Sequence, residues 1–448
     1  MIKSDKFFNA TNSLIIGIGL LFIGILMVIG RDWLYINFVN VFLIAILFLS
    51  IKQFVNYFIG KKKDKKINFT QCFFNLIFCL VLSCFKNIPL SILPIIFGFY
   101  LLLNAIIKFI SGYILVKNKA NGKLTEFMIG FVYLIVSIPI IFSPLKNLNK
   151  VLIVVGIYII LLGINFIMDF ISFLIPKRVK NKLKRRIRIT LPAIVEAVIP
   201  YVVLNEINYQ LNKENYDKSF VFEEKSEDVV PDLEVFVHTS NRGFNRMGHV
   251  DLYYNGKVIS YGNYDDSSMR FFNMIGDGVI FTTDKDKYIP FCIEHSKKTL
   301  FVFGLKLTER QKNNIDKALN KMFDNLYEWK SPYEEALMQR KRVNKNKYTD
   351  YASRLNQATN SKFYKFKSGK YKNYFVVGNN CCRLADNIIG KSGSDLLKMN
   401  GVITPGAYYE YLNREFQKKN SMVISRKIYN SENVDKKKIK EIFKGFSK

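Results

Sequence analysis

Six apolar runs dominate the first 176 residues, and they restrict what this chain can fold into more than any other feature. They cover about 13–30, 34–51, 69–85, 89–110, 126–144 and 151–175. A bilayer core of about 30 Å needs roughly 20 apolar residues in a helix. Proline inside some runs is tolerated because transmembrane helices accept it better than soluble helices do. Residues 1–176 are therefore predicted to form a six-helix transmembrane bundle.

Charge and hydropathy are distributed unevenly along the chain. The 448 residues carry a net charge of +30, yet 49% are hydrophobic and 15% aromatic, which excludes a disordered basic protein. Residues 1–176 hold 16 Lys+Arg and 5 Asp+Glu, a net of +11, and the remaining residues contribute +19. The basic charge thus accompanies membrane spans, and nucleic acid is not expected as a partner.

Lys and Arg in the short loops predict the orientation of the spans, because cytoplasmic loops are enriched in these residues. Alternate loops are rich in basic residues, at Lys3 and Lys6, Lys61–Lys66, Lys117–Lys123 and Lys177–Arg188. The other loops hold only Arg31, Lys86, Lys146 and Lys150. Six spans then give a multi-pass protein of the cell membrane with both termini in the cytoplasm. The first run lacks a small-residue cleavage site, so a cleaved leader is not expected.

The spans contain a weak internal repeat. Phe42, Tyr100 and Tyr158 are spaced by 58 residues, and Gly98 and Gly156 keep the same spacing. This pattern predicts three helical-hairpin repeats. Six spans in three hairpins resemble the DUF308/HdeD family of small membrane proteins over about residues 10–175, a resemblance that implies no catalytic residues. Contact between copies through these helices is left open.

A basic stem follows the last span. KRVKNKLKRRIR, residues 177–188, carries eight basic residues in twelve. Anionic headgroups attract such segments by about 1 kcal/mol per charge, so the lipid bilayer is the expected partner here. Residues 190–211 are apolar but are interrupted by Pro192, Pro200 and Glu196, and they are not expected to form a seventh span. We interpret residues 177–230 as stem and linker.

Residues 231–448 have the pattern of a soluble α+β domain with a basic tail. Asn255-Gly256 lies between HVDLYY and KVISYG, a strong hairpin signal that pairs Tyr254 with Lys257 and Asp251 with Ser260. Further strands are predicted at 233–240, 297–307, 362–367 and 373–378. Helices are predicted at 308–329, with Thr308 as N-cap, and at 381–390.

The most reactive pair that the sequence offers is Cys381 and His249. The chain passes from an apolar strand through Gly-Asn-Asn into a helix beginning at Cys381. A helix N-terminus lowers the pKa of a thiol and supplies N–H groups for an oxyanion. His249 begins the hairpin and is the candidate base. Alternation places Asp251 and Ser260 on the same face, and Ser260 is the predicted orienting residue, with Asp251, Asn263 and Asp265 as alternatives.

A Gly-His strand hairpin followed by Asn-Cys at a helix start resembles the circularly permuted NlpC/P60 superfamily. This papain-like group includes the lecithin:retinol acyltransferase-like and YiiX-like proteins. The resemblance covers about 231–415, including a Thr-Pro-Gly turn at 404–406. It implies a Cys381 nucleophile and a His249 base acting on an amide, ester or thioester bond of a peptide or acyl lipid. It places the third polar residue near Ser260.

Several alternatives accompany this site. Cys382 is the adjacent rival for the nucleophile, and His238 is a candidate second histidine. Cys72, Cys79 and Cys84 lie in a span, while Cys292 is isolated. With three His and no Cys-x-x-Cys pair, no zinc site or other metal or cofactor is expected.

Two functions are weighed. The first is a membrane-anchored cysteine hydrolase or acyltransferase at the cytoplasmic membrane face. The second is a non-catalytic membrane scaffold or stress-response protein whose papain-like domain only binds. A transporter has little support because the spans carry few charges.

Overall fold

The computed structural model describes residues 2–59, 62–85, 87–174, 187–188, 220–226, 229–239, 248–296, 298–339, 343–391, 398–399, 404–417 and 421–430. They divide into a helical unit, Ile16–Ile110 with Leu124–Ile164, and a second unit that holds all the strands. The apolar segment 190–211 and most of the basic stem lie outside the described residues.

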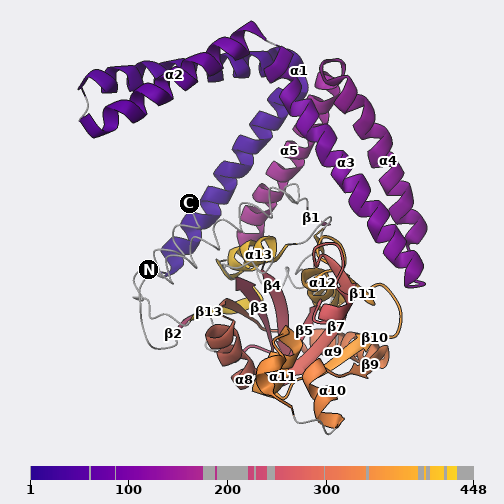
Figure 1. The fold of residues 1–448 in the computed structure, drawn as a ribbon. Helices are drawn as coiled ribbons and strands as arrows, with labels where there is room; N and C mark the ends of the chain where they lie inside the picture. Colours follow the sequence, from indigo (N-terminus) through magenta and orange to yellow (C-terminus); the bar gives the residue numbers. More distant parts are fainter. Residues whose placement is uncertain are drawn as a thin grey trace. The chain divides into compact units, whose positions relative to one another are not determined.

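Five long helices precede the strands in the chain (Figure 1). They are α1 (Ile2–Ile59), α2 (Lys62–Cys84), α3 (Asn87–Lys117), α4 (Lys123–Phe142) and α5 (Pro144–Leu174). Among the described residues, five segments are long and apolar enough to cross a membrane, two of them in α1 and one in each of α3, α4 and α5. The predicted span at 69–85 forms the shorter apolar helix Phe69–Cys84 within α2.

The first predicted hairpin differs from the expectation. Its two spans, Thr11–Gly30 and Tyr35–Val55, lie in the single helix α1, which changes direction along its length (Figure 1). The residues between the spans, Arg31 to Leu34, include neither Pro nor Gly, so nothing in this sequence ends the helix. The first of the three expected hairpin repeats therefore has no loop between its arms.

Glycines bring α1 and α5 into close contact. A Cβ atom on Gly24 would lie 2.8 Å from the carbonyl oxygen of Gly156, and one on Gly163 would lie 2.8 Å from that of Gly17. Small residues at such spacing let helix backbones approach in a membrane. On α3, Lys108 forms a 2.8 Å ion pair with Glu126 of α4, so this charge near a span end is paired.

A nine-stranded sheet forms the centre of the second unit, in the order β2-β13-β8-β3-β4-β5-β7-β10-β9. Every neighbouring pair in it is antiparallel. Its strands are β2 (Phe220–Lys225), β3 (Leu233–Thr239), β4 (His249–Tyr254), β5 (Lys257–Gly262), β7 (Val279–Thr283), β8 (Thr299–Leu305), β9 (Leu326–Trp329), β10 (Lys362–Phe366) and β13 (Val423–Asn430). Two short pairs accompany it, β6 (Ile275–Asp277) with β11 (Asn373–Phe375) and β1 (Ile187–Arg188) with β12 (Lys398–Met399).

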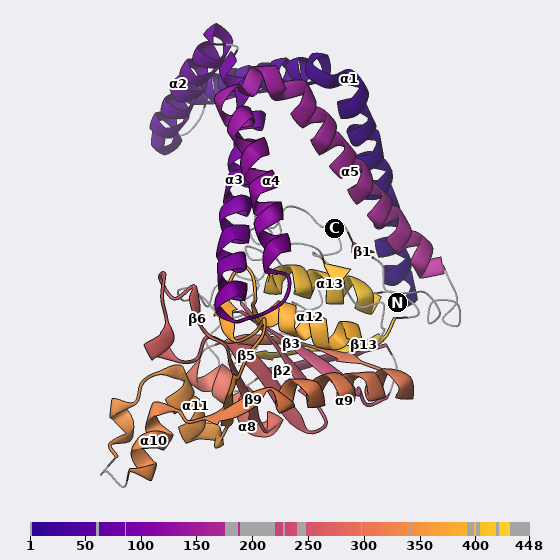
Figure 2. The same ribbon diagram turned by 90° about the vertical axis from the view of Figure 1, so that its right-hand side faces the viewer.

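Both faces of the sheet are covered. Alternate strand residues such as Val235, Val250 and Ile259 pack against α9 (Glu309–Asp324), α12 (Cys381–Lys391) and α13 (Pro405–Gln417). The opposite face, with Phe236 and Val258, packs against α8 (Lys285–Pro290), the π-helical turn Phe291–His295 and α11 (Tyr351–Thr359). Figure 2 shows α12 and α13 on one side of the strands and α8 and α11 on the other. The remaining helix, α10 (Pro332–Met338), packs on α11.

The predicted hairpin is confirmed together with its register. Tyr254 pairs with Lys257, and Asp251 pairs with Ser260. Asn255 and Gly256 have φ values of 48° and 80°, which a two-residue turn of this kind requires. Period-two alternation then fixes which side chains of β4 and β5 share a face.

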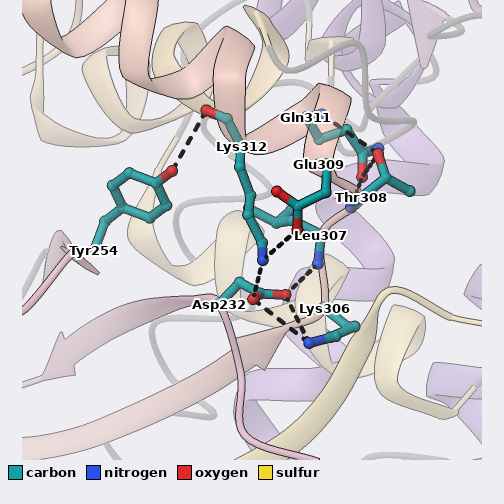
Figure 3. Close-up of polar contacts among 8 residues, drawn as sticks. All are labelled: Asp232, Tyr254, Lys306, Leu307, Thr308, Glu309, Gln311 and Lys312. Atoms are coloured by element: carbon teal, nitrogen blue, oxygen red, sulfur yellow. Dashed lines mark hydrogen bonds and ion pairs between the residues drawn. The ribbon is translucent and has the colours of Figure 1, made fainter.

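The predicted helix at 308–329 is too long. Helix α9 ends at Asp324, and Leu326–Trp329 forms the edge strand β9. Its beginning is confirmed: the Thr308 side chain accepts from the Gln311 N–H, and the Gln311 side chain accepts from the Thr308 N–H. Asp232 accepts from the Leu307 N–H at 2.9 Å and pairs with Lys312 at 2.9 Å, which ties the start of β3 to α9 (Figure 3).

The boundary of the folded region also moves. Residues 220–225 belong to the stretch expected to be linker, yet they form β2 at the edge of the sheet, paired with β13. Phe220, Val221 and Phe222 supply the β-branched and aromatic residues that favour a strand. Folded structure in this part of the chain therefore begins before Pro231.

Candidate active site

Antiparallel pairing places two histidines opposite one another. His238, near the end of β3, pairs with His249, the first residue of β4. Asp251 follows two positions later on the same face of β4, and Ser260 of β5 lies directly opposite it. Three neighbouring strands thus bring four polar side chains together.

The Nε2 atom of His249 has three polar neighbours. It lies 2.9 Å from the Ser260 Oγ and 2.9 Å from the Tyr264 hydroxyl, both in hydrogen-bonding directions. It also lies 2.8 Å from Oδ1 of Asp251. This carboxylate oxygen has no partner in good hydrogen-bond geometry. Asp251 therefore acts on the His249 ring through its charge. With Nε2 engaged, Nδ1 is the nitrogen that can exchange a proton with a thiol.

Asp251 is fully buried and carries the negative charge of the cluster. Its Oδ2 accepts a 2.6 Å hydrogen bond from the Tyr288 hydroxyl and lies 2.6 Å from Nε2 of His238. Burial opposes ionisation of this carboxyl, but the nearby His249 and His238 hold its pKa well below the usual range. Burial lowers the pKa of His238 to about 4, which keeps that ring neutral at pH 7.

Cys381 begins α12, and Asn380 caps this helix because its Oδ1 accepts from the Arg383 N–H at 2.9 Å. The Cys381 side chain is 3% exposed and belongs to the core on the α12 side of the sheet. Its Sγ lies 3.8 Å from the Tyr374 hydroxyl and 3.9 Å from Sγ of Cys382. Helix α12 packs on β4, which brings the thiol to the end of the strand where His249 lies.

The Cys381 thiol and the His249 imidazole shift each other's pKa in opposite directions. Burial opposes ionisation of Cys381, but hydrogen bonds from Cys382 and His249, together with the charge of His249, hold the thiol pKa well below its usual range. Burial likewise opposes protonation of His249, yet the charges of Asp251 and Cys381 raise its pKa to about 10. Both shifts favour the form of the pair in which the thiol is deprotonated and the imidazole is protonated.

Gly248 allows this arrangement. Its φ is +78°, and a Cβ atom there would lie 2.7 Å from the His238 carbonyl oxygen and 2.9 Å from Cβ of Pro405. Any side chain would force β3, β4 and α13 apart beside the imidazole. The sequence motif Gly-His thus reflects close packing around His249 as well as backbone conformation.

The other predicted residues have separate places. Ser260 lies at the imidazole, as predicted. Cys382 is fully buried, and burial and the neighbouring Cys381 raise its pKa. Asn263 donates to the Asn273 carbonyl, and Asp265 pairs with Lys365, so neither alternative orients His249. His238 contacts the carboxylate of Asp251 from the side opposite His249.

Two tyrosines of the site were missed by sequence reasoning. Tyr264 contacts His249 after the end of β5, and Tyr288 reaches Asp251 from α8. Tyrosine is abundant in this chain, with 25 copies, and no spacing distinguishes these two. Asp251 was among the predicted alternatives for the orienting residue. Its position two residues after His249 indicated that the two side chains share a face of β4.

No family model, curated protein or solved structure matches this chain. Among the described residues, no group of three or more His, Cys, Asp and Glu side chains is arranged to hold a metal ion. The chemistry that these residues can perform by themselves is nucleophilic attack by a thiolate, with proton transfer through an imidazole polarised by a buried carboxylate.

Proposed function

We propose that this protein is a membrane-anchored cysteine hydrolase or acyltransferase that acts on an amide, ester or thioester bond. The observation that carries the proposal is the buried chain of contacts from Asp251 to His249 to Cys381, with the thiol at the start of a helix. A lowered thiol pKa and a raised imidazole pKa are what an activated cysteine requires.

The proposed reaction has two halves. In the first, the Cys381 thiolate attacks the acyl carbonyl carbon, and the His249 imidazolium protonates the departing nitrogen, oxygen or sulfur. In the second, His249 takes a proton from water or another acceptor, which attacks the thioester and releases Cys381. Backbone N–H groups at the start of α12 support the oxyanion, and Asp251 stabilises the imidazolium throughout.

The permuted papain-like arrangement stays part of this proposal. It is supported by the order of the parts, a histidine strand before a cysteine helix, and by the antiparallel sheet on which α12 packs. The DUF308/HdeD resemblance of the helices is supported by the apolar pattern alone. An acyl lipid or a peptide-linked acyl group at the cytoplasmic face is the proposed substrate class, and the bilayer is the proposed partner.

One observation favours the second candidate function, a scaffold whose α+β domain only binds. Cys381 is 3% exposed, and a substrate carbonyl must reach this sulfur. The two functions differ in a direct test on the full chain in proteoliposomes. A nitrophenyl thioester of a medium-chain acid serves as substrate, and iodoacetamide serves as thiol probe.

We expect thioester turnover that falls by about 100-fold or more in Cys381→Ala and in His249→Gln. We also expect Cys381 alkylation to proceed at lower pH than that of an ordinary thiol, and to require alkaline pH in His249→Gln because the imidazolium no longer stabilises the thiolate. Cys292→Ala is the matched control for a thiol that is not activated, since burial raises the pKa of Cys292 to about 12. Turnover retained in Cys381→Ala would exclude the enzyme.

A further inference from the structure

The segment between β5 and β7 forms two arms, residues 265–270 and 275–277, joined by an exposed aromatic turn, residues 271–274. Phe271 is 73% exposed and Phe272 is 86% exposed. Among the described residues beyond Leu174, the only other aromatic in the set of strongly exposed large hydrophobic residues is Tyr327, at 47%. Two adjacent Phe rings in water are unfavourable unless another apolar surface covers them.

The turn holds these rings in an unusual backbone conformation. Phe271, Phe272 and Asn273 have φ values of 50°, 54° and 66°, in the left-handed region that bulky residues rarely adopt. Arg270 and Ile275 close the turn with a pair of backbone hydrogen bonds of 2.8 and 3.2 Å. Such strain persists where the surrounding structure imposes it, and it concentrates at functional positions.

Ion pairs and a hydrogen bond hold the two arms of this segment together. Lys365 of β10 forms ion pairs of 2.6 Å with Asp265 and 2.8 Å with Asp277, one on each arm. The Asp277 N–H also donates to the Ser268 Oγ at 2.9 Å. The aromatic turn is thus presented on a fixed support.

Both arms lead to the candidate site. The first arm begins directly after Tyr264, whose hydroxyl contacts His249. The second arm is β6, which pairs with β11, and Tyr374 of β11 lies against Cys381. The Val376 N–H donates to the Met274 carbonyl, which sets another apolar residue beside the turn.

We propose that the aromatic turn inserts into the surface of the lipid bilayer in which this chain is anchored. The described residues include five segments long and apolar enough to cross a membrane, so the covalent connection holds the α+β unit near a bilayer. Two Phe side chains are a weak anchor for a free protein but are sufficient for a tethered one. The exposed Arg270 beside them matches anionic headgroups.

Docking at this turn deepens the proposed function, because it would bring the Cys381 site to the membrane surface where acyl lipids lie. It does not require a reactive thiol, and its test uses no turnover. Trp33 is replaced by Phe, Phe272 is replaced by Trp, and the full chain is reconstituted in phosphatidylcholine–phosphatidylglycerol vesicles. Lipids brominated near the headgroup end of the acyl chain quench an inserted indole.

We expect bromolipid to quench the Phe272→Trp variant at least about twofold more than a matched Tyr327→Trp variant. The difference should shrink when phosphatidylglycerol is omitted or when Arg270→Gln is added, and it should persist with Cys381→Ala. If the Phe272→Trp protein with Cys381 intact showed this quenching but no thioester turnover, docking would stand and only the proposed function would be overturned.

Equal quenching of the two variants would overturn the proposal. A blue-shifted Phe272→Trp emission without bromolipid quenching would also overturn it, because the turn would then be covered by protein. If the Trp variant does not fold, Phe271→Asn/Phe272→Asn keeps the left-handed turn, since Asn tolerates it. Anionic vesicles should protect residues 268–277 from hydrogen exchange in the wild-type protein. They should protect these residues less in the double variant, and unchanged protection would contradict docking.

Discussion

At the scale of single residues, the buried carboxylate of Asp251 defines the candidate site. It lies between two histidines with opposite titration behaviour, because burial lowers the pKa of His238 to about 4 while the pKa of His249 rises to about 10. The difference arises from the neighbours: His249 faces both Asp251 and the Cys381 thiolate, and His238 is fully enclosed. One carboxylate can stabilise one imidazolium here.

This assignment predicts that Asp251 matters more than Ser260 for the reaction. Asp251→Asn keeps the shape but removes the charge, so turnover should fall by about 100-fold or more, and the pH at which Cys381 becomes alkylated should rise. Ser260→Ala should cost less than about tenfold, since Tyr264 still contacts Nε2. Steady-state turnover and the alkylation pH profile measure both effects. A larger loss in Ser260→Ala would return the orienting role to Ser260.

The neutral His238 makes stability depend on pH. Its folded pKa lies below the usual 6.5, so its contribution is present above pH 6.5 and is lost as the pH falls towards 4. Between pH 7 and pH 5 we expect this histidine to remove about 2 kcal/mol of unfolding free energy. The measurement is denaturant unfolding of the detergent-solubilised chain, compared with His238→Phe. An equal loss in both proteins would contradict the assignment.

At the scale of elements, sequence periodicity predicted the register of the central hairpin and six of the thirteen strands that the structure describes, namely β3, β4, β5, β8, β10 and β11. The register of β4 and β5 followed from Asn255-Gly256, because a two-residue turn permits a single pairing. The end of α9 did not follow, since Leu326 continues the helical apolar spacing but pairs in β9 instead. Phe363 and Phe366 of β10 lie opposite Trp329 and Leu326, and this tertiary pairing outweighs local periodicity.

Close packing of α1 and α5 provides a test with an internal control on one helix. Gly24→Val should destabilise the solubilised protein by about 1–3 kcal/mol, because its side chain would meet the Gly156 carbonyl and Ile160. Gly19→Val should have little effect, since a Cβ atom at Gly19 meets nothing within 4 Å. Thermal unfolding in detergent measures both. Similar losses in the two variants would show that the contact is absent.

At the scale of the whole molecule, the number of membrane crossings decides where the α+β unit lies. Five segments meet the length and hydropathy of a span, and the shorter Phe69–Cys84 is the sixth candidate. An even number places the N-terminus and the α+β unit on the same side of the membrane. An odd number places them on opposite sides.

We predict six crossings, with Phe69–Cys84 included. In a background in which all six native cysteines are replaced by Ser, single cysteines at Lys119 and Glu309 should react with a membrane-impermeant maleimide from the side that carries an N-terminal epitope tag. A cysteine at Lys146 should react from the opposite side. Sealed right-side-out and inverted vesicles distinguish the two sides. An epitope on the side opposite Glu309 would show that Phe69–Cys84 does not cross.

The sequence by itself determined the membrane-spanning character, the change to an α+β region and the residues Cys381, His249 and Ser260 as candidates. These follow from local causes: apolar length, alternation, turn residues and helix starts. Tertiary structure decided the rest. Asp251 emerged as the principal charged neighbour of His249, and Tyr264 and Tyr288 joined the site, because β4, the segment after β5, and α8 bring these side chains to one buried point. Such contacts between distant residues depend on packing, which local pattern does not encode.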